Sequence, residues 1–309
     1  MGFKIFKFLK KFIPKYVKTN LKIFFKKIKI KIPHLFLKLI KLEIQVKTSN
    51  DKIFKYYTQD LLSVNSIGKS KVWEPHIIKF SEQYIKDFKC NNIVDIGAHI
   101  GYHSLNFSTL TKGNVYSFEP QPQNFTLLKK NILINQKENI YPYMVGLSDQ
   151  NNFSKIPIVS KTKKLGNMGD FTLNNLNTNF YTKVPTRTLD SFQFGDVSLI
   201  KIDVQGWEKK VLLGAKETIL KFKPTLIIEF ERHQLVKTNT TVKDLVEVLE
   251  QFNYKIFYLE YLYPSDHICI HKSNLKSFKN IFNNYIYNHN ENNSINENFK
   301  LGINKKIVM

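Results

Sequence analysis

Short apolar runs alternate with longer amphipathic stretches along residues 91–272. The apolar runs have the length and composition of buried strands. They are NIVDIG (92–97), NVYSFEP (114–120), IYPYMVGL (140–147), VSLIKIDV (197–204), PTLIIEFE (224–231), YKIFYLE (254–260) and HICIHK (267–272). Helical spacing of apolar residues predicts helices between several of them, over 100–110, 121–135, 206–222 and 241–252. Residues 51–90 also carry a helical pattern.

The repeated strand–helix units predict an α/β fold. We expect a doubly wound, mostly parallel sheet of seven strands with helices on both faces, of the Rossmann-like kind. Only a short connection joins the last two strands, so one of them must run antiparallel to the other.

Both ends of the chain differ in composition from this central part. The net charge is +22, and thirteen lysines with no acidic residue lie in residues 1–42. Within residues 3–18, apolar residues recur at helical spacing and lysines fill the other side. We therefore expect a basic amphipathic N-terminal arm over 1–50, a domain over 51–272, and an Asn/Lys-rich helix and tail over 273–309.

A basic amphipathic arm of this kind suits an anionic membrane surface, with its apolar face towards the lipid. Contact with nucleic acid, and plain packing or disorder, are the alternatives for residues 1–42. No apolar run reaches the roughly 18 residues needed to span a bilayer, and lysines interrupt every candidate signal peptide. The expected location is therefore cytoplasmic, or peripheral at a membrane surface.

The turn after the first strand indicates a ligand. In a doubly wound sheet, ligands bind beyond the carboxyl ends of the strands, and here Asp95, Gly97 and Gly101 form the pattern D-x-G-x-x-x-G. A dinucleotide-binding turn has the spacing G-x-G-x-x-G, and a carboxylate at Asp95 would repel a pyrophosphate. A ligand with an ammonium and a sulfonium group gains from that carboxylate instead. S-adenosylmethionine is such a ligand, and the two glycines would let the backbone approach it.

The second strand supplies an independent sign of the same cofactor. Glu119 ends this strand, 22 residues after Gly97, where an acid can accept the protons of both ribose hydroxyls. The segment VGLSD after the third strand would border the adenine, with Ser148 or Asp149 as its polar contact. The predicted cofactor-binding residues are therefore Asp95, Gly97, Ala98, Gly101, Glu119, Pro120 and Ser148.

These motifs resemble successive blocks of the FkbM-type methyltransferases. The blocks run from about Trp73 to about residue 271 and include VDIGAHIGYHSL, VYSFEPQPQNFTLLKKN, VGLSD, PTRTLDSF and LIKIDVQGWEKKVLLGA. The resemblance implies a class I, S-adenosylmethionine-dependent methyltransferase fold and activity on hydroxyl groups of sugars or polyketide-like products. The chain departs from the family at Gln205, because the family's strand-four block commonly reads D-V-E-G. A family role for that Glu in catalysis or metal binding would put the activity of this chain in question.

Methyl transfer to a sugar hydroxyl needs alignment of donor and acceptor and gains from a general base. Asp203 ends the fourth strand beside the expected methyl position and is one candidate catalytic residue; cofactor contact or turn formation are its alternatives. His233, after the fifth strand, is the other candidate because a histidine titrates near neutral pH. No metal site is predicted, although Asp203 with Glu229 or Glu231 offers oxygen ligands of the kind that Mg²⁺ takes. Acceptor recognition is expected from the polar segment of about 40 residues between the third and fourth strands.

The predicted function is O-methylation of a hydroxyl on a sugar, glycan or glycolipid, and two alternatives stay open. One is a nucleic-acid methyltransferase, but adenine-N6 and cytosine-N4 enzymes carry a Pro-Pro-aromatic turn where this chain reads DVQGW. Cytosine-C5 transfer needs a nucleophilic cysteine in a turn, whereas Cys90 and Cys269 are expected to be buried and without a disulfide. The other alternative is a binding protein that kept the fold, which Gln205 and the basic arm motivate.

Overall fold

The structure, a computed structural model of the 309-residue chain, describes residues 43–57, 60, 63–158, 172–174, 179–259 and 266–280. The expected helix on the basic arm lies outside the described residues, as does the tail from residue 281 onwards. Among the residues described, no helix has the length and apolar character that a membrane crossing requires.

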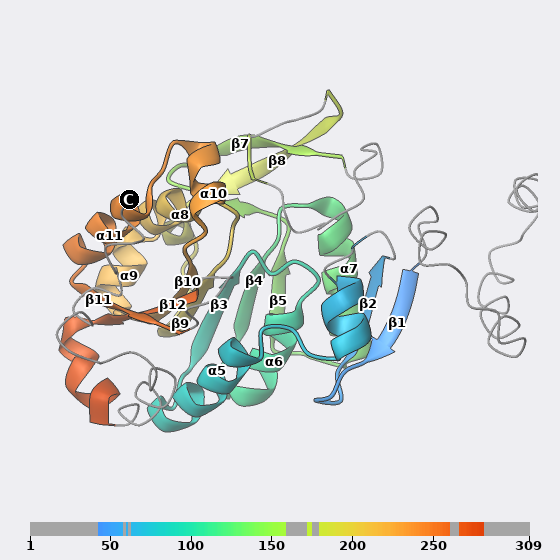
Figure 1. The fold of residues 1–309 in the computed structure, drawn as a ribbon, viewed down its shortest axis with the longest axis horizontal. Coiled ribbons are helices and arrows are strands. Elements are labelled where there is room, and N and C mark those ends of the chain that lie inside the picture. The colour runs from blue at the N-terminus through green and yellow to red at the C-terminus, as the bar shows by residue number, and fades with distance from the viewer. Residues whose placement is uncertain are drawn as a thin grey trace, which may run out of the picture. The chain divides into compact units, whose positions relative to one another are not determined.

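A seven-stranded sheet forms the centre of the unit that begins at Glu43, in the order β11-β12-β10-β9-β3-β4-β5 (Figure 1). Its strands are β3 (Asn92–Ile96), β4 (Val115–Phe118), β5 (Ile140–Tyr143), β9 (Val197–Ile202), β10 (Thr225–Glu229), β11 (Tyr254–Tyr258) and β12 (Asp266–His271). Strands β10, β9, β3, β4 and β5 pair in parallel, whereas β12 runs antiparallel to both of its neighbours. The mostly parallel sheet is confirmed, and its antiparallel member is the last strand.

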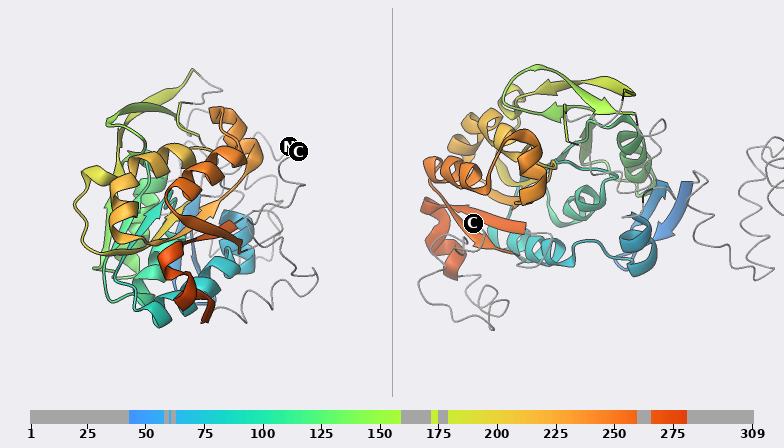
Figure 2. Two further views of the ribbon diagram at one scale, coloured as in Figure 1. Left: turned by 90° about the vertical axis from the view of Figure 1, so that its left-hand side faces the viewer. Right: turned by 45° about the horizontal axis from the view of Figure 1, so that its top comes forward.

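Helices cover both faces of this sheet (Figures 1 and 2). They are α5 (Pro75–Phe88), α6 (Tyr102–Leu110), α7 (Pro122–Ile134), α8 (Glu208–Gly214), α9 (Lys216–Phe222), α10 (Arg232–Leu235) and α11 (Val242–Gln251). Apolar residues of α5, α6 and α7 pack with strand residues such as Ile93 and Leu199, while those of α8, α9 and α11 pack with the neighbours Val94 and Ile200. Because successive strand side chains point to opposite faces, the sheet is doubly wound as expected.

A two-stranded hairpin packs on α7 and corrects one expectation. Strands β1 (Glu43–Lys47) and β2 (Ile53–Tyr57) pair antiparallel, and a π-helix, η1 (Val64–Ser70), follows. Lys55 N donates to Asn131 Oδ1 of α7 at 2.7 Å. The helical pattern expected over 51–90 is therefore wrong at its start, since β2 is held by a side chain 76 residues further along the chain. The arm boundary expected at residue 50 falls inside this hairpin.

The segment between the third and fourth strands of the central sheet forms a small sheet of its own, in the order β6-β8-β7. Its strands are β6 (Gly146–Leu147), β7 (Asn152–Pro157) and β8 (Tyr181–Arg187). Single turns of 3-10 helix occur outside this sheet, at η2 (Leu189–Ser191), η3 (Val236–Thr238) and η4 (Lys272–Asn274). The strand expected over 140–147 is thus divided between two sheets. Thr172 Oγ1 donates to Gln205 O at 2.5 Å, so this segment reaches the turn that follows β9.

Candidate active site

The turn after β3 is closed by its own hydrogen bonds. Gly97 N and Ala98 N both donate to Phe118 O at 3.0 Å, and Gly101 N donates to Ala98 O at 2.7 Å. An anion-binding turn presents its amide groups to the ligand. Here these three amides are already used, which suits a cationic ligand better than a phosphate.

Both glycines of this turn are required by the protein's own packing. Gly97 has a φ of +86°, and a Cβ on it would lie 1.8 Å from Asp203 O. Gly101 has a φ of +89°, and its Cβ would lie 2.6 Å from Leu128 Cδ1. Gly97 therefore lets the turn rest against the end of β9, and Gly101 lets it rest against α7. The room for a ligand expected from the same glycines stays a prediction.

Asp95 lies beneath this turn and is completely buried. Ser104 Oγ of α6 donates to its Oδ2 at 2.5 Å, while its Oδ1 has no hydrogen-bond partner. Its neighbour in the sheet is Lys201 of β9, and the negative charge of Asp95 helps to raise the pKa of Lys201. Asp95 therefore supports the turn from beneath, and the direct contact with the cofactor that the sequence predicts for it stays a prediction.

Glu119 connects the end of β4 to the same turn. Its Oε2 accepts a hydrogen bond from His99 N at 2.9 Å, and its Oε1 accepts one from Gln121 N at 2.8 Å. The side chain of Asn124 is a third hydrogen-bond partner of this carboxyl group. A carboxylate has about four acceptor positions, so Glu119 keeps capacity for a ribose hydroxyl. Burial raises the pKa of Glu119 to about 7, and the negative charge of Asp203 acts in the same direction.

Polar atoms without a hydrogen-bond partner gather around this turn. Besides Asp95 Oδ1, they include Nδ1 of His99 and Nδ1 of His103. The ring of Trp73 lies edge-on to that of His99, with ring centroids 5.6 Å apart. Since buried polar atoms in proteins are normally hydrogen-bonded, these atoms suit a polar ligand such as the amino-acid end of S-adenosylmethionine.

The turn after β9 brings two carboxyl groups together. Lys201 Nζ, on a side chain that is 3% exposed, donates to Asp203 Oδ2 at 2.9 Å. Gln205 Nε2 donates to Asp203 Oδ1 and to Glu229 Oε2, both at 3.1 Å. The Asp203 side chain is 25% exposed, so it is the member of the pair that a second substrate can reach.

The two carboxyl groups differ in their protonation. Burial raises the pKa of Asp203, but the charge of Lys201 and hydrogen bonds from Lys201, Gln205 and Glu229 outweigh it and lower the pKa overall. Burial and then the negative charges of Asp203 and Asp266 raise the pKa of Glu229 well above its ordinary value. Near neutral pH, Asp203 is therefore the ionised member of the pair and Glu229 the protonated one.

A buried cation and a further acid complete the cluster. Burial lowers the pKa of Lys201, but the charges of Asp203, Glu74 and Asp95 outweigh it and raise the pKa. Glu74, at a φ of +44°, places its Oε2 2.6 Å from His103 Nε2. Lys201 is not among the predicted site residues, although a lysine inside the buried run LIKID signals a charged partner, because unpaired lysines are almost never buried.

Backbone geometry fixes the turn after β9. Glu208 Oε1 accepts hydrogen bonds from Val204 N at 3.2 Å and from Gly206 N at 3.0 Å. Gly206 has a φ of +96°, and a Cβ there would lie 2.2 Å from Gln234 O. Gln205 itself has a φ of +54°, which non-glycine residues adopt infrequently. The direction of the Gln205 side chain is thus set by a tightly packed turn.

Three other predicted site residues have their contacts outside the pair of Asp203 and Glu229. Pro120 packs near Gly146, at 3.6 Å from the position of a Cβ there. The buried Ser148 Oγ accepts from Trp207 Nε1 at 3.2 Å and donates to Asp149. His233 Nε2 lies 2.5 Å from Glu231 Oε1, and the His233 side chain is 65% exposed. These contacts join none of the three to Asp203, and an adenine contact for Ser148 stays a prediction.

Two further observations concern metal and cysteine chemistry. Within the described ranges, no group of three or more His, Cys, Asp or Glu side chains is arranged to hold a metal ion. Cys90 and Cys269 are buried and unpaired, as expected from the sequence.

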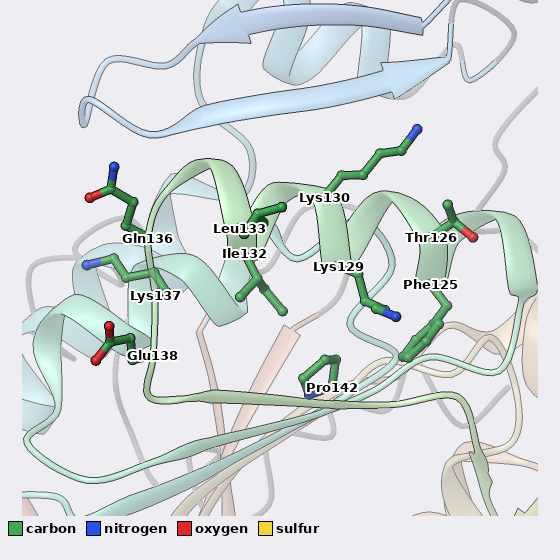
Figure 3. Close-up of a pocket in the computed structure, with 10 residues that line it drawn as sticks. All are labelled: Phe125, Thr126, Lys129, Lys130, Ile132, Leu133, Gln136, Lys137, Glu138 and Pro142. Atoms are coloured by element: carbon green, nitrogen blue, oxygen red, sulfur yellow. The ribbon is translucent and has the colours of Figure 1, made fainter.

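A surface hollow of about 740 Å³ lies between α7 and β5 (Figure 3). Figure 3 shows Phe125, Lys129 and Ile132 of α7 directed towards Pro142 of β5. None of the residues that line this hollow belongs to the cluster around Asp203. The hollow is therefore a separate feature of the surface.

The order of the central sheet, the closed turn after β3 and the acid at the end of β4 together define a class I methyltransferase fold. The chain matches the methyltransferase FkbM domain over residues 95–256, just over half of its 309 residues, and it belongs to this family of S-adenosylmethionine-dependent enzymes. S-adenosylmethionine is accordingly its cofactor, and the residues around the β3 turn fit it.

Similar proteins include one with a described substrate. Hexuronic acid methyltransferase AglP of Haloferax volcanii is 30% identical over 124 residues, which are 39% of this chain and 48% of that protein. The chain thus spans about half the length of the curated relative that it matches.

Two solved structures are also similar. Methyltransferase FkbM from Methylobacillus flagellatus KT has 18% identity and a TM-score of 0.42, covering 58% of this chain and 43% of that one. The O-methyltransferase from Bacillus cereus in complex with SAH has 15% identity and a TM-score of 0.40, covering 65% and 82%.

Proposed function

We propose that this protein transfers a methyl group from S-adenosylmethionine to a hydroxyl of a sugar in a glycan or glycolipid. The observation that carries this proposal is the position of Asp203. Its carboxylate is ionised and partly exposed, and its own main chain is joined to the cofactor turn, since Asp203 N donates to Ile96 O at 3.0 Å. A base fixed to the cofactor turn is what alignment of donor and acceptor requires.

The cofactor would be held at the β3 side of the site. Glu119 has an acceptor position left for a ribose hydroxyl, and its carboxylate is fixed by His99 N, Gln121 N and the side chain of Asn124. Asp95 contributes negative charge from beneath the turn. S-adenosylmethionine supplies a methyl group on a cationic sulfur, which keeps the electron pair of the breaking bond when the acceptor oxygen takes the methyl carbon.

Asp203 accepts the proton of the acceptor hydroxyl in this proposal. General-base help of this kind contributes roughly 10²–10⁴-fold to a rate. Lys201 and the hydrogen bond from protonated Glu229 keep Asp203 ionised before the reaction, and Asp203 itself holds the proton afterwards until it passes to solvent. The geometry favours Asp203 over His233, whose exposed ring pairs with Glu231.

A sugar acceptor is supported by the hexuronic acid methyltransferase that resembles part of the chain. A hexuronic acid offers a methyl donor both hydroxyl groups and a carboxylate, so the stability of the product shows which group was methylated. Methylation of a hydroxyl gives an ether that survives mild alkali, whereas methylation of the carboxylate gives an ester that does not.

The first test is calorimetric titration with S-adenosylmethionine. The wild type should bind it, and Glu119→Ala should bind at least about tenfold more weakly, because each charged hydrogen bond is worth about 1.5–3 kcal/mol. Absence of binding by the wild type would remove the methyltransferase proposal altogether.

The second test uses a methyl-labelled donor and a panel of acceptors. The panel contains hexuronic acid oligosaccharides, neutral oligosaccharides, glycolipids and RNA, with Asp203→Asn as the control that keeps the cofactor site. Mass spectrometry should find alkali-stable methyl groups on a sugar. Alkali-labile label would assign the carboxylate as acceptor, and label on RNA would favour a nucleic-acid methyltransferase.

We further propose that the basic arm, residues 1–42, holds the enzyme at an anionic membrane surface; its thirteen lysines and lack of acids support this. A full-length variant with Lys4, Lys7, Lys11, Lys15 and Lys18 changed to Gln should float less with anionic liposomes than the wild type. Equal flotation of the two proteins would refute a role for the arm.

A further inference from the structure

Gln205 is placed between two carboxyl groups by its backbone and its length. Its Nε2 carries two hydrogens and lies 3.1 Å from Asp203 Oδ1 and 3.1 Å from Glu229 Oε2. The left-handed backbone at Gln205 and the hydrogen bond from Thr172 to its carbonyl hold the side chain in that direction. One amide nitrogen therefore reaches both members of the pair.

Two adjacent carboxyl groups repel each other when both are ionised, unless a proton or a cation lies between them. Here Lys201 neutralises one oxygen of Asp203, and Gln205 donates to its other oxygen. Other ionisable groups that act on the pair come from all sides. They are Glu74 before α5, His99 after β3, Glu119 after β4, Glu208 on α8, Glu231 after β10 and Asp266 on β12.

The excess of acids in this surrounding makes a shared proton the natural state of the pair. A glutamate at position 205 would add a third carboxylate within reach of Asp203 and Glu229. Oxygen ligands in that number are typical of a divalent cation site. A glutamine of the same length donates hydrogen bonds at the same place and carries no charge.

We propose that Gln205 is a positioning residue for methyl transfer, which holds Asp203 and Glu229 together as one proton-sharing pair and does so without a divalent cation. This inference rests on the proposed function, in which Asp203 is the base. It also means that the departure from D-V-E-G does not disable the site but replaces a charged group by a neutral bridge.

The first experiment compares Gln205→Met with Asn139→Leu in the full chain. Asn139 is a matched control because its Nδ2 also bridges two oxygens at 3.1 Å, but these are the neutral carbonyls of Ser108 and Gly113. The amide of Gln205 favours the ionised form of Asp203 and helps to lower its pKa, so its loss should cost more above the ordinary pKa of an aspartate than below it. We expect the drop in Tm of Gln205→Met to be about 4 °C larger at about pH 6 than at about pH 3.

The Tm of the control variant, Asn139→Leu, should drop by the same amount at both pH values. A pH-independent loss for Gln205→Met as well would show that Gln205 only packs, and would overturn the proposal. The pH dependence is the signature that a merely structural role does not produce.

The second experiment uses Mn²⁺ as the probe and Tm as the readout. Gln205→Glu should be less stable than the wild type in EDTA and should be restored by Mn²⁺, whereas the wild type and Gln205→Met should not respond to the metal. Stabilisation of the wild type by Mn²⁺, abolished in Asp203→Asn, would mean that a cation holds the pair, and the inference would fail.

Titration with S-adenosylmethionine separates this inference from the proposed function. Gln205→Met leaves the turn after β3 intact and should bind the cofactor within about twofold of the wild type. Binding by both proteins together with a pH-independent loss of Tm would refute only the role of Gln205. Absence of binding by the wild type would refute the function on which that role depends.

Discussion

The turns after β3 and after β9 lie side by side at the same edge of the central sheet, and they are built alike but bonded differently. Each contains a non-glycine residue with a left-handed backbone, His99 at a φ of +50° and Gln205 at +54°. At the first turn, the carboxylate of Glu119 accepts hydrogen bonds from backbone amides. At the second turn, the carboxylate of Asp203 accepts them from the side chains of Lys201 and Gln205.

This difference separates a rigid end of the site from an adjustable one. Backbone donors cannot be changed by substitution, so two of the three hydrogen bonds to Glu119 depend on the fold alone, and only the one from Asn124 comes from a side chain. Side-chain donors can be exchanged without moving the chain, so the protonation of Asp203 depends on which residues stand at 201 and 205. A cofactor common to a whole family suits the first kind of site, and chemistry adapted to one acceptor suits the second.

The largest expected effect comes from the point where the two turns touch. Gly97→Ala would place a Cβ 1.8 Å from Asp203 O at a backbone conformation that alanine rarely adopts. We expect a loss of more than about 4 kcal/mol in the free energy of unfolding, enough to prevent folding. Gly195→Ala is the control, because its Cβ would lie 3.4 Å from Asn92 Nδ2, and it should cost less than about 1 kcal/mol. Urea unfolding of both variants checks this. A stable Gly97→Ala would show that the two turns do not pack against each other at this point.

Much of this arrangement could be predicted from the sequence, and the limits have a physical reason. The seven strands and the helices α6, α7 and α11 follow from local periodicity, as does the position of Glu119 at a strand end. The burial of Asp95 and the reason for Gly97 could not be predicted, because both depend on the strand β9, about 100 residues away in the chain. The hairpin β1–β2 was missed for the same reason, since α7 holds it.

The next effect tests the adjustable turn. Asp203→Asn removes the carboxylate of the proposed base but keeps its size, so kcat should fall roughly 10²–10⁴-fold while binding of S-adenosylmethionine changes little. The variant also leaves Lys201 buried without its nearest counter-charge, which should lower Tm. Rates with the acceptor found in the labelling screen measure the first effect. A fall of less than tenfold would show that the base lies elsewhere.

A smaller effect tests the rigid turn through its titration. The pKa of Glu119 is raised from 4.5 to about 7, so the folded protein without ligand loses stability as the pH rises between these values. Ribose hydroxyls donate to the ionised form, so binding should release a proton below about pH 7. The affinity for S-adenosylmethionine should then fall by up to about tenfold per pH unit below that value. Calorimetry in buffers of different ionisation enthalpy measures both quantities, and Glu119→Gln should remove the pH dependence.

The smallest effect is expected at His233, which lies just beyond β10 and outside both turns. Its imidazole is 65% exposed and pairs with the buried carboxyl group of Glu231, which acts on the Asp203–Glu229 pair only through its charge on Glu229. His233→Ala should therefore keep kcat within about threefold of the wild type and leave its pH profile unchanged. Loss of the acidic limb of that profile in the variant would assign the base to His233. Asp203 would then serve to hold the acceptor, and the side chains of the second turn would adjust binding instead of proton transfer.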